Sequence, residues 1–169
     1  AFPLIRIGLE ELSPINLTII RLFIACLLFI FIFAIKPKKF SKLQKKDVLP
    51  IFILGFLGIV IYHLGLNYGE QFISASIASL IIATIPIFVV IFAFMFLKEK
   101  ITKTIIFGVI IALIGVLIIS IFGQSLISFE ISYNLGLFAV LIASLVGAGY
   151  TVAGKKLLTR YSPLSLTSY

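Results

Sequence analysis

Apolar residues fall in long, almost unbroken blocks along this chain, and short polar segments separate them. A helix needs about 20 consecutive apolar residues to cross a bilayer. The blocks lie at about 1–9, 15–35, 48–68, 73–97, 104–122 and 135–154, and a further helix is expected near Pro163. The pattern predicts an all-α, polytopic transmembrane helical bundle. The first block opens without Met and is short, so we interpret it as the end of a first span.

The composition agrees with a membrane protein. Hydrophobic residues make up 62% of the sequence and charged residues 12%, and the mean hydropathy is +1.27. Soluble domains contain about 25% charged residues, so too few charges are present here to cover a surface that faces water. Cys26 is the only cysteine, so no disulfide within the chain is expected.

The basic residues predict the orientation of the spans. Twelve of the fourteen Lys and Arg residues lie in three short segments, at 36–46, 98–103 and 155–160. Even numbers of spans separate these segments, so they share one face, which the positive-inside rule makes cytoplasmic. This distribution explains the net charge of +8 without a nucleic-acid partner. We expect a multi-pass protein of the cell (plasma) membrane, with the residues that precede Ala1 in the cytoplasm.

A short internal repeat predicts an inverted architecture. The segments "LEELSPINLT" (9–18) and "LTRYSPLSLT" (158–167) share the pattern Ser-Pro-apolar-x-Leu-Thr. Five spans separate the two copies, and an odd number places them on opposite faces of the membrane. Inverted repeats are the architecture of many secondary transporters, although a match of this length also arises by chance.

Residues 65–120 resemble the signature half of the EamA family, in the drug/metabolite transporter superfamily. The features that carry the resemblance are a run rich in Ser and Ala, a proline within the following helix, the turn "FLKEKIT" and a final helix that bears glycines. Residues 2–28, which include Arg21, resemble the end of that family's first helix and its second helix.

The resemblance implies a carrier of about ten helices, built from two inverted five-helix repeats. Residues 1–122 are then the first repeat, with its first helix truncated at the N-terminus. Residues 123–134 are an external loop, and residues 135–169 begin the second repeat. No single substrate is implied, because the family carries varied amino acids, nucleobase-like compounds and other metabolites.

The fourth block contains Pro86 near its middle. A proline inside a helix removes a backbone donor at a cost of ~3 kcal/mol, and in lipid the freed group must find a partner in neighbouring helices, hydroxyls or water. Ser76, Ser79 and Ala83 lead toward the proline along one side. We expect Pro86 to be a hinge and the two serines to border a substrate path. Close packing of helices through small residues is an equally good explanation.

The third block contains the best polar cluster, in "IYHLGLNYG" (61–69). His63 and Asn67 are four residues apart and share a helix face, while Tyr62 shares the adjacent face with Gly58, Gly65 and Gly69. Tyr62, His63 and Asn67 are candidates for contact with a solute, and His63 can change protonation between pH 5 and 8. The alternative is a hydrogen bond between helices, worth ~0.6–2 kcal/mol.

Two more polar residues lie within apolar blocks. Arg21 carries a charge that costs ~2.5–3.5 kcal/mol at mid-membrane on insertion scales, so it snorkels, pairs with Glu10 or Glu11, or attracts an anionic solute. Tyr150 faces the path or belongs to the interfacial aromatics. Two seams of small residues, Gly108-Ala112-Gly115 and Ala139-Ala143-Gly147, are expected to pack against neighbouring helices.

Other candidate chemistry is sparse. No Asp or Glu lies in the middle of a block, and no metal-ligand spacing, nucleophile motif or phosphate loop is visible. The sequence predicts no enzyme, catalytic residue, metal site or cofactor. We expect secondary transport, in the direction of export, of small metabolites such as amino acids by alternating access. The alternative is a non-transporting membrane scaffold or assembly subunit. The expected partners are a small-molecule solute and the lipid bilayer, and a homodimer is left open.

Overall fold

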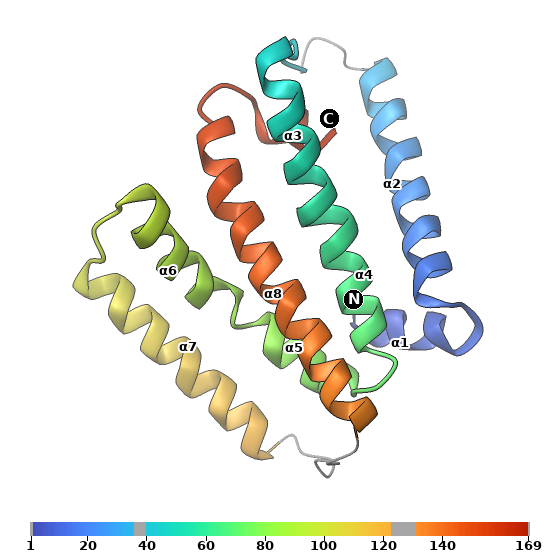
Figure 1. The fold of residues 1–169 in the computed structure, drawn as a ribbon, viewed down its shortest axis with the longest axis vertical. Helices are drawn as coiled ribbons and strands as arrows, with labels where there is room; N and C mark the ends of the chain where they lie inside the picture. Colours follow the sequence, from blue (N-terminus) through green and yellow to red (C-terminus); the bar gives the residue numbers. More distant parts are fainter. Residues whose placement is uncertain (1, 36–39, 123–130, 169) are drawn as a thin grey trace.

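The computed structural model describes residues 2–35, 40–122 and 131–168, and within them it is helical, without strands. The helices are α1 (Phe2–Glu11), α2 (Pro14–Ile35), η2 (Lys45–Asp47), α3 (Val48–Gly55), η3 (Phe56–Ile61), α4 (Tyr62–Gly69), α5 (Ala75–Ile82), α6 (Ile85–Leu97), α7 (Lys103–Phe122), α8 (Ile131–Leu157) and α9 (Pro163–Ser168). Figure 1 shows a bundle in which α3 and α4 continue as one rod beside α8. This arrangement confirms the polytopic helical bundle.

Four stretches are long and apolar enough to cross a membrane, at 14–35, 45–69, 75–97 and 131–157. They coincide with the predicted second, third, fourth and sixth blocks, and α7 is a further apolar helix at the fifth. The third stretch is continuous but includes a π-helical segment, η3, which the sequence pattern did not predict. Segments of this kind often occur at functional sites.

The rod formed by α3, η3 and α4 packs closely on α8, because glycines let the two backbones approach. A Cβ atom on Gly58 would lie 2.0 Å from the Tyr150 ring, and one on Gly69 would lie 2.8 Å from the backbone oxygen of Gly136. Gly65 is in contact with Ala139 and Ala143 in the same way. One face of the third span is therefore a packing surface.

The two seams of small residues behave differently. Ala143 and Gly147 on α8 pack against the third span. Gly108 and Gly115 on α7 have no described atom within 4 Å of an added Cβ. The expectation that Gly108 and Gly115 pack on a neighbour is therefore not met within the described residues. Figure 1 shows α7 at the edge of the bundle, away from the α3–α4 rod.

The fourth span is broken, and the break lies just before Pro86. α5 ends at Ile82, Ala83 and Thr84 form a turn, and Pro86 lies in the first turn of α6. A proline there removes a hydrogen bond that the helix end would lack anyway. The Ile81 carbonyl at the break accepts hydrogen bonds from the backbone N–H and the hydroxyl of Thr84, at 3.0 and 2.6 Å.

The two Ser-Pro segments form the same corner twice. In each, a backbone N–H three residues on donates to the serine hydroxyl at 3.2 Å, namely Asn16 to Ser13 and Ser165 to Ser162. In each, the threonine hydroxyl donates to the proline carbonyl, at 2.7 Å for Thr18 and 2.9 Å for Thr167. The first corner lies at the lower end of Figure 1 and the second at the upper end, near the C label.

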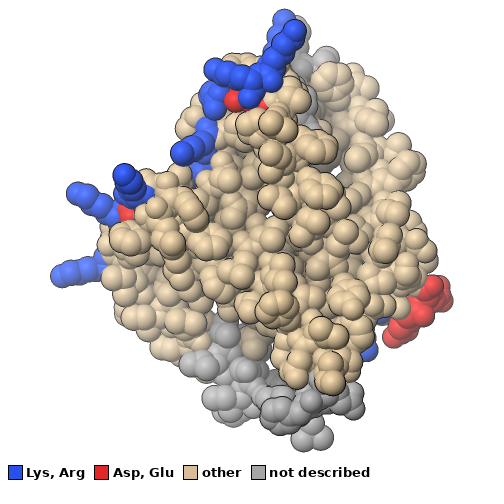
Figure 2. Space-filling model, in the orientation of Figure 1, with Lys and Arg blue, Asp and Glu red and all other residues tan. Residues whose placement is uncertain are grey.

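Charge is distributed unequally between these two ends. Figure 2 shows most Lys and Arg side chains over the upper end and the left edge of the bundle, and exposed acidic side chains at the lower right. The upper end carries the start of α3 and the end of α8, and the left edge carries the connection from α6 to α7 (Figure 1). The basic segments at 98–103 and 155–160 and the described part of the first one, 40–46, therefore lie on the same side of the bundle, as the sequence predicted. Residues 36–39 of the first segment lie outside the described residues.

Candidate functional site

The third span has a polar face as well as a glycine face. His63, Asn67 and Glu70 follow at intervals of four and three residues, so they line one side of α4 and its end. This side meets α2, whereas the glycines meet α8. The polar groups of the third span are therefore concentrated where it faces the second span.

Asn67 is the centre of a buried hydrogen-bonded cluster. Its side chain is fully buried, and its amide nitrogen donates to the Thr18 hydroxyl at 2.7 Å. Its amide oxygen accepts from a guanidinium nitrogen of Arg21 at 3.1 Å. This hydrogen bond, and not a pair with Glu10 or Glu11, holds the predicted membrane arginine. A charge inside the bundle thus faces a polar partner from the neighbouring helix, as intramembrane charges usually do.

His63 lies one turn before Asn67. Its Nδ1 is 2.7 Å from the carbonyl oxygen of Ile59, within the π-helical segment. A carbonyl only accepts, so Nδ1 carries the hydrogen and Nε2 is left as an acceptor in the neutral ring. The ring also contacts Tyr62 edge to face, with centroids 5.1 Å apart.

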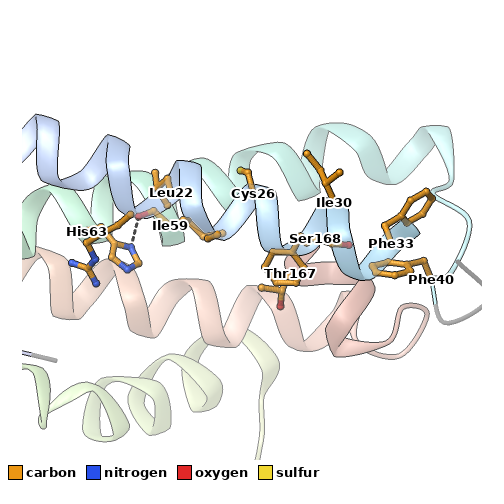
Figure 3. A pocket seen from close by; sticks show the side chains of 12 residues that line it. Leu22, Cys26, Ile30, Phe33, Phe40, Ile59, His63, Thr167 and Ser168 are labelled. Carbon is orange, nitrogen blue, oxygen red and sulfur yellow. Dashed lines mark hydrogen bonds between the residues drawn. The ribbon is translucent and has the colours of Figure 1, made fainter. Parts of the chain in front are cut away.

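Arg21 and His63 line a pocket of about 630 Å³ between α2 and the third span. The rest of the lining is mostly apolar and comes from Leu22, Ala25, Cys26, Phe29, Ile30, Phe33, Phe40, Ile59, Thr167 and Ser168. Figure 3 shows His63 at one end of this pocket and Phe33, Phe40 and the α9 residues toward the other. The pocket therefore joins a charged end within the bundle to the end where the second Ser-Pro corner lies.

The structure places the other predicted site residues elsewhere. Tyr62 packs against Gly147, and Tyr150 covers Gly58, so both aromatic rings belong to the contact between the third span and α8. Ser76 is exposed, and its carbonyl accepts from the Ser79 hydroxyl at 2.7 Å. Of the predicted set, only Arg21 and His63 line this pocket. Asn67 lies beside them as the hydrogen-bond partner of Arg21.

Thr18 and Ser144 were missed from the sequence. Thr18 is buried as the partner of Asn67. Ser144 is fully buried on α8, with its hydroxyl 3.3 Å from that of Thr84 and 3.5 Å from the Ile81 carbonyl at the break in the fourth span. No local signal marks Ser144, whereas Thr18 is the shared threonine of the Ser-Pro repeat.

Glu70 was also missed, because the sequence places it in a loop just beyond the third span. It is fully buried, and neither carboxylate oxygen has a hydrogen-bond partner among the described residues. Burial raises the pKa of Glu70 to about 7, although the nearby charges of Arg21 and Arg6 act in the opposite direction. The seven-residue spacing from His63 was the available signal.

A second buried carboxylate, Asp47, lies at the other end of the third span and is fully paired. Arg160 donates to both of its oxygens at 2.9 Å, and the Tyr161 hydroxyl donates to one of them at 2.9 Å. Tyr161 in turn accepts from the backbone of Gln44 at 3.0 Å, and burial raises the pKa of its phenol. This cluster fastens the start of the third span to the segment between α8 and α9.

The arrangement of apolar helices defines a polytopic membrane protein, and comparison with known proteins gives its family. Residues 1–121 match the EamA-like transporter family, so the chain belongs to that family.

The chain is also similar to three longer relatives. It is 39% identical, over 99% of its length, to an uncharacterized transporter of Archaeoglobus fulgidus, and 34% identical, over 100%, to the uncharacterized transporter YdfC of Bacillus subtilis. It is 33% identical, over 100% of its length, to a protein named "probable terminal-alkyne amino-acid exporter" in Streptantibioticus cattleyicolor. It covers 57%, 53% and 54% of these three proteins, about half of each. No solved structure matches the chain.

Proposed function

We propose that this chain is the greater part of one repeat, and the beginning of a second, in a secondary transporter of small metabolites such as amino acids. The observation that carries the proposal is the pocket of about 630 Å³ with Arg21 and His63 at its inner end. Its volume is within the range of about 300–1,000 Å³ that is usual for small-ligand sites. Such polar groups are expensive within a membrane and are retained mainly for function or for essential pairing.

The lining supports an amino acid or another small carboxylate as the solute. Arg21 has a planar guanidinium that can hold a carboxylate with two hydrogen bonds, and only one hydrogen bond to Asn67 occupies it within the described residues. The neutral His63 ring offers an acceptor at Nε2 for an ammonium group. Leu22, Phe29 and Ile30 then surround an apolar side chain.

The repeat architecture supports alternating access. The two Ser-Pro corners have the same pattern of hydrogen bonds and lie at opposite ends of the bundle (Figure 1). This is the arrangement expected of one unit that is repeated in inverted orientation. On this view residues 1–122 are the first repeat, and α8 belongs to the start of the second. α8 begins at Ile131, so residues 131–134 of the predicted external loop are helical, and its residues 123–130 lie outside the described residues. The break before Pro86 is the proposed hinge, and Ser76, Ser79, Tyr62 and Tyr150 are proposed to border the path only in another state of the carrier.

The charge distribution supports an orientation and a direction. The basic segments would face the cytoplasm of a plasma-membrane protein by the positive-inside rule, and the outer end of the pocket lies toward the same side (Figures 1 and 3). Loading from the cytoplasm suits export, which is also the activity in the name of one relative.

Cys26 provides a direct test, because the chain's only cysteine lines the pocket. In the complete reading frame with any other cysteine replaced, a membrane-impermeant methanethiosulfonate reagent should modify Cys26 from the cytoplasmic side, and bound leucine should slow the reaction. The matched control is Phe31→Cys in a Cys26→Ser background, because Phe31 is 63% exposed on α2 but does not line the pocket. A scaffold protein would leave Cys26 and the control equally unreactive.

Transport itself is measured in inside-out vesicles with labelled leucine. The proposal predicts accumulation that falls by about 10–100-fold in Arg21→Gln, since a hydrogen bond to a charged group is worth about 1.5–3 kcal/mol. Equal accumulation in the variant and the natural protein would contradict the assigned role of Arg21.

A further inference from the structure

The side chain of Glu70 is the one buried acid in the described residues whose carboxylate has no partner. Asp47, the other buried acid, receives three hydrogen bonds. Glu70 receives none at either carboxylate oxygen, and its side chain is fully buried. Removing an ionised carboxylate from water without a partner is strongly unfavourable, whereas the neutral acid is tolerated. The surroundings of Glu70 therefore favour the protonated form.

Two arginines lie near Glu70, and both donate to neutral oxygens instead of its carboxylate. Arg6, from α1, donates to the backbone carbonyls of Glu70 and Gln71. Arg21, from α2, donates to the amide of Asn67, which precedes Glu70 by one helical turn. Each guanidinium still has free donors in the described structure, so an ionised Glu70 would find a counter-ion within a small rearrangement.

The other neighbouring elements bring few titratable groups. On its own span Glu70 interacts with the Tyr62 phenol, and His63 lies two turns away on the same face. α5 contains no Asp, Glu, Lys, Arg or His, and neither does α8 before Lys155. On α8, Tyr133 packs against the apolar cluster that contains Leu66 and Ile73. On α1, the exposed Glu10 lines a small cavity with Arg6 and Gln71. The charge state of Glu70 is thus controlled by its burial and by two arginines.

We propose that Glu70 is a proton-binding site whose occupancy controls Arg21, an inference that rests on the proposed transport function. With the proton bound, Glu70 is neutral and Arg21 is available to the solute carboxylate in the pocket. When the site opens to water, the O–H bond breaks, the proton leaves to water, and the carboxylate that remains competes with the solute for Arg21. Protonation of Glu70 and binding of an anionic group at Arg21 therefore stabilise each other.

A proton fits this site better than a metal cation. Two nearby guanidinium groups repel a bound cation, whereas a proton cancels the carboxylate charge without adding a net positive charge. The described residues also contain no group of three or more His, Cys, Asp or Glu residues that could hold a metal ion.

An infrared titration tests the proposal without any transport assay. The complete carrier in nanodiscs is taken between about pH 5 and pH 9, and the C=O band of protonated carboxylic acids is followed in the natural protein, Glu70→Gln and Glu10→Gln. We expect a band that disappears with a midpoint near pH 7, that is absent in Glu70→Gln and that is unchanged in Glu10→Gln, since Glu10 is exposed. Identical titrations of the natural protein and Glu70→Gln would overturn the proposal.

Arg6→Gln provides a second variant in which the carboxylate is kept. Loss of this positive charge should move the midpoint of the Glu70 band to higher pH, because Arg6 favours the ionised form. An unchanged midpoint would show that Arg6 does not act on Glu70 and would also contradict the proposal. This arm remains informative if Glu70→Gln does not fold.

Equilibrium binding of labelled leucine tests the link to Arg21. In the natural protein the affinity should fall as the pH rises through about 7, whereas Glu70→Gln should bind with an affinity that does not change over this range. The same pH dependence in both proteins would contradict the link. If leucine neither binds nor is transported, the proposal that leucine is a solute of this carrier is wrong. The infrared titration still decides whether Glu70 binds a proton.

Discussion

The two faces of the third span differ in the contacts they make: one packs closely on α8, and the other forms hydrogen bonds with α2. Toward α8, Gly58, Gly65 and Gly69 remove side chains so that two backbones come together. Toward α2, Asn67 brings polar atoms that must each find a partner inside the bundle. The first face gains packing contacts, which drive helix association in lipid. The second gains little stability and holds the candidate site. Small residues and polar residues therefore need separate interpretations, even when they alternate in one segment.

The glycine face should be the more sensitive of the two to a single methyl group. Gly69→Ala would place a Cβ 2.3 Å from Val140 and 2.8 Å from the Gly136 carbonyl, and a backbone oxygen cannot swing aside. Overpacking of this kind costs about 1–3 kcal/mol, so we expect a lower midpoint of thermal unfolding in detergent. Val140→Ala added to the variant should restore only part of the loss, because the backbone conflict remains.

Gly108→Ala is the matched control for this prediction. No described atom lies within 4 Å of an added Cβ at that position, and alanine is favoured over glycine in a helix by roughly 0.5–1 kcal/mol. Unfolding midpoints that fall equally in both variants would show that α7 packs as tightly as the third span and would remove the contrast between the two seams.

The polar face should respond to loss of its central amide. Asn67→Ala removes the partner that Arg21 has inside the bundle. Thr18 loses the donor Asn67 but still donates to the Pro14 carbonyl, so we expect a cost toward the lower end of the range of about 1–3 kcal/mol for an unsatisfied buried group. Thermal unfolding should then show a smaller loss than for Gly69→Ala, and leucine binding should weaken as well because Arg21 is no longer oriented. Asn16→Ala, at an exposed position of α2, should change neither measurement.

Glu70, at the end of the polar face, should make the stability of the protein depend on pH. The folded pKa of Glu70 is raised to about 7 from 4.5, so the folded state holds this proton more tightly than the unfolded state does. Its contribution to stability is full below the unfolded value and is lost as the pH rises through about 7. The natural protein should match Glu70→Gln in unfolding midpoint at acidic pH and fall below it at alkaline pH. Parallel curves for the two proteins would contradict this assignment.

The helical bundle could be predicted from the sequence because its signals are local. Block length fixes the spans, and the clustering of Lys and Arg in short segments fixes which connections share an end. The Ser-Pro corner was also predictable, since its hydrogen bonds all join residues within five positions of one another. Each of these features depends on the chain's own neighbours and not on how the helices pack.

The candidate site could be predicted only in part, because partner choice depends on packing between distant helices. His63 and Asn67 were found by their spacing, but the sequence gives no sign that Asn67 would bind Thr18 and Arg21. Glu70 was placed in the connection after the third span, because no local pattern shows that Arg6 of the distant α1 would reach its backbone carbonyl. The break in the fourth span also lies slightly earlier than predicted. Pro86 lies in the first turn of α6, where a proline is favourable, and the turn that interrupts the helix is formed by the preceding residues Ala83 and Thr84.

The smallest expected change in stability is at the break in the fourth span, where α8 meets a polar group as well as the glycine face. Ser144 comes from the same helix that meets the glycine face, yet its hydroxyl reaches the Thr84 hydroxyl and the Ile81 carbonyl at 3.3 and 3.5 Å. These distances are long for hydrogen bonds, and Thr84 already satisfies the carbonyl at 2.6 Å. Ser144→Ala should therefore lower stability by only about 0.5 kcal/mol, whereas Thr84→Val should cost more. Equal losses in the two variants would mean that α8, and not the span's own threonine, holds the break together.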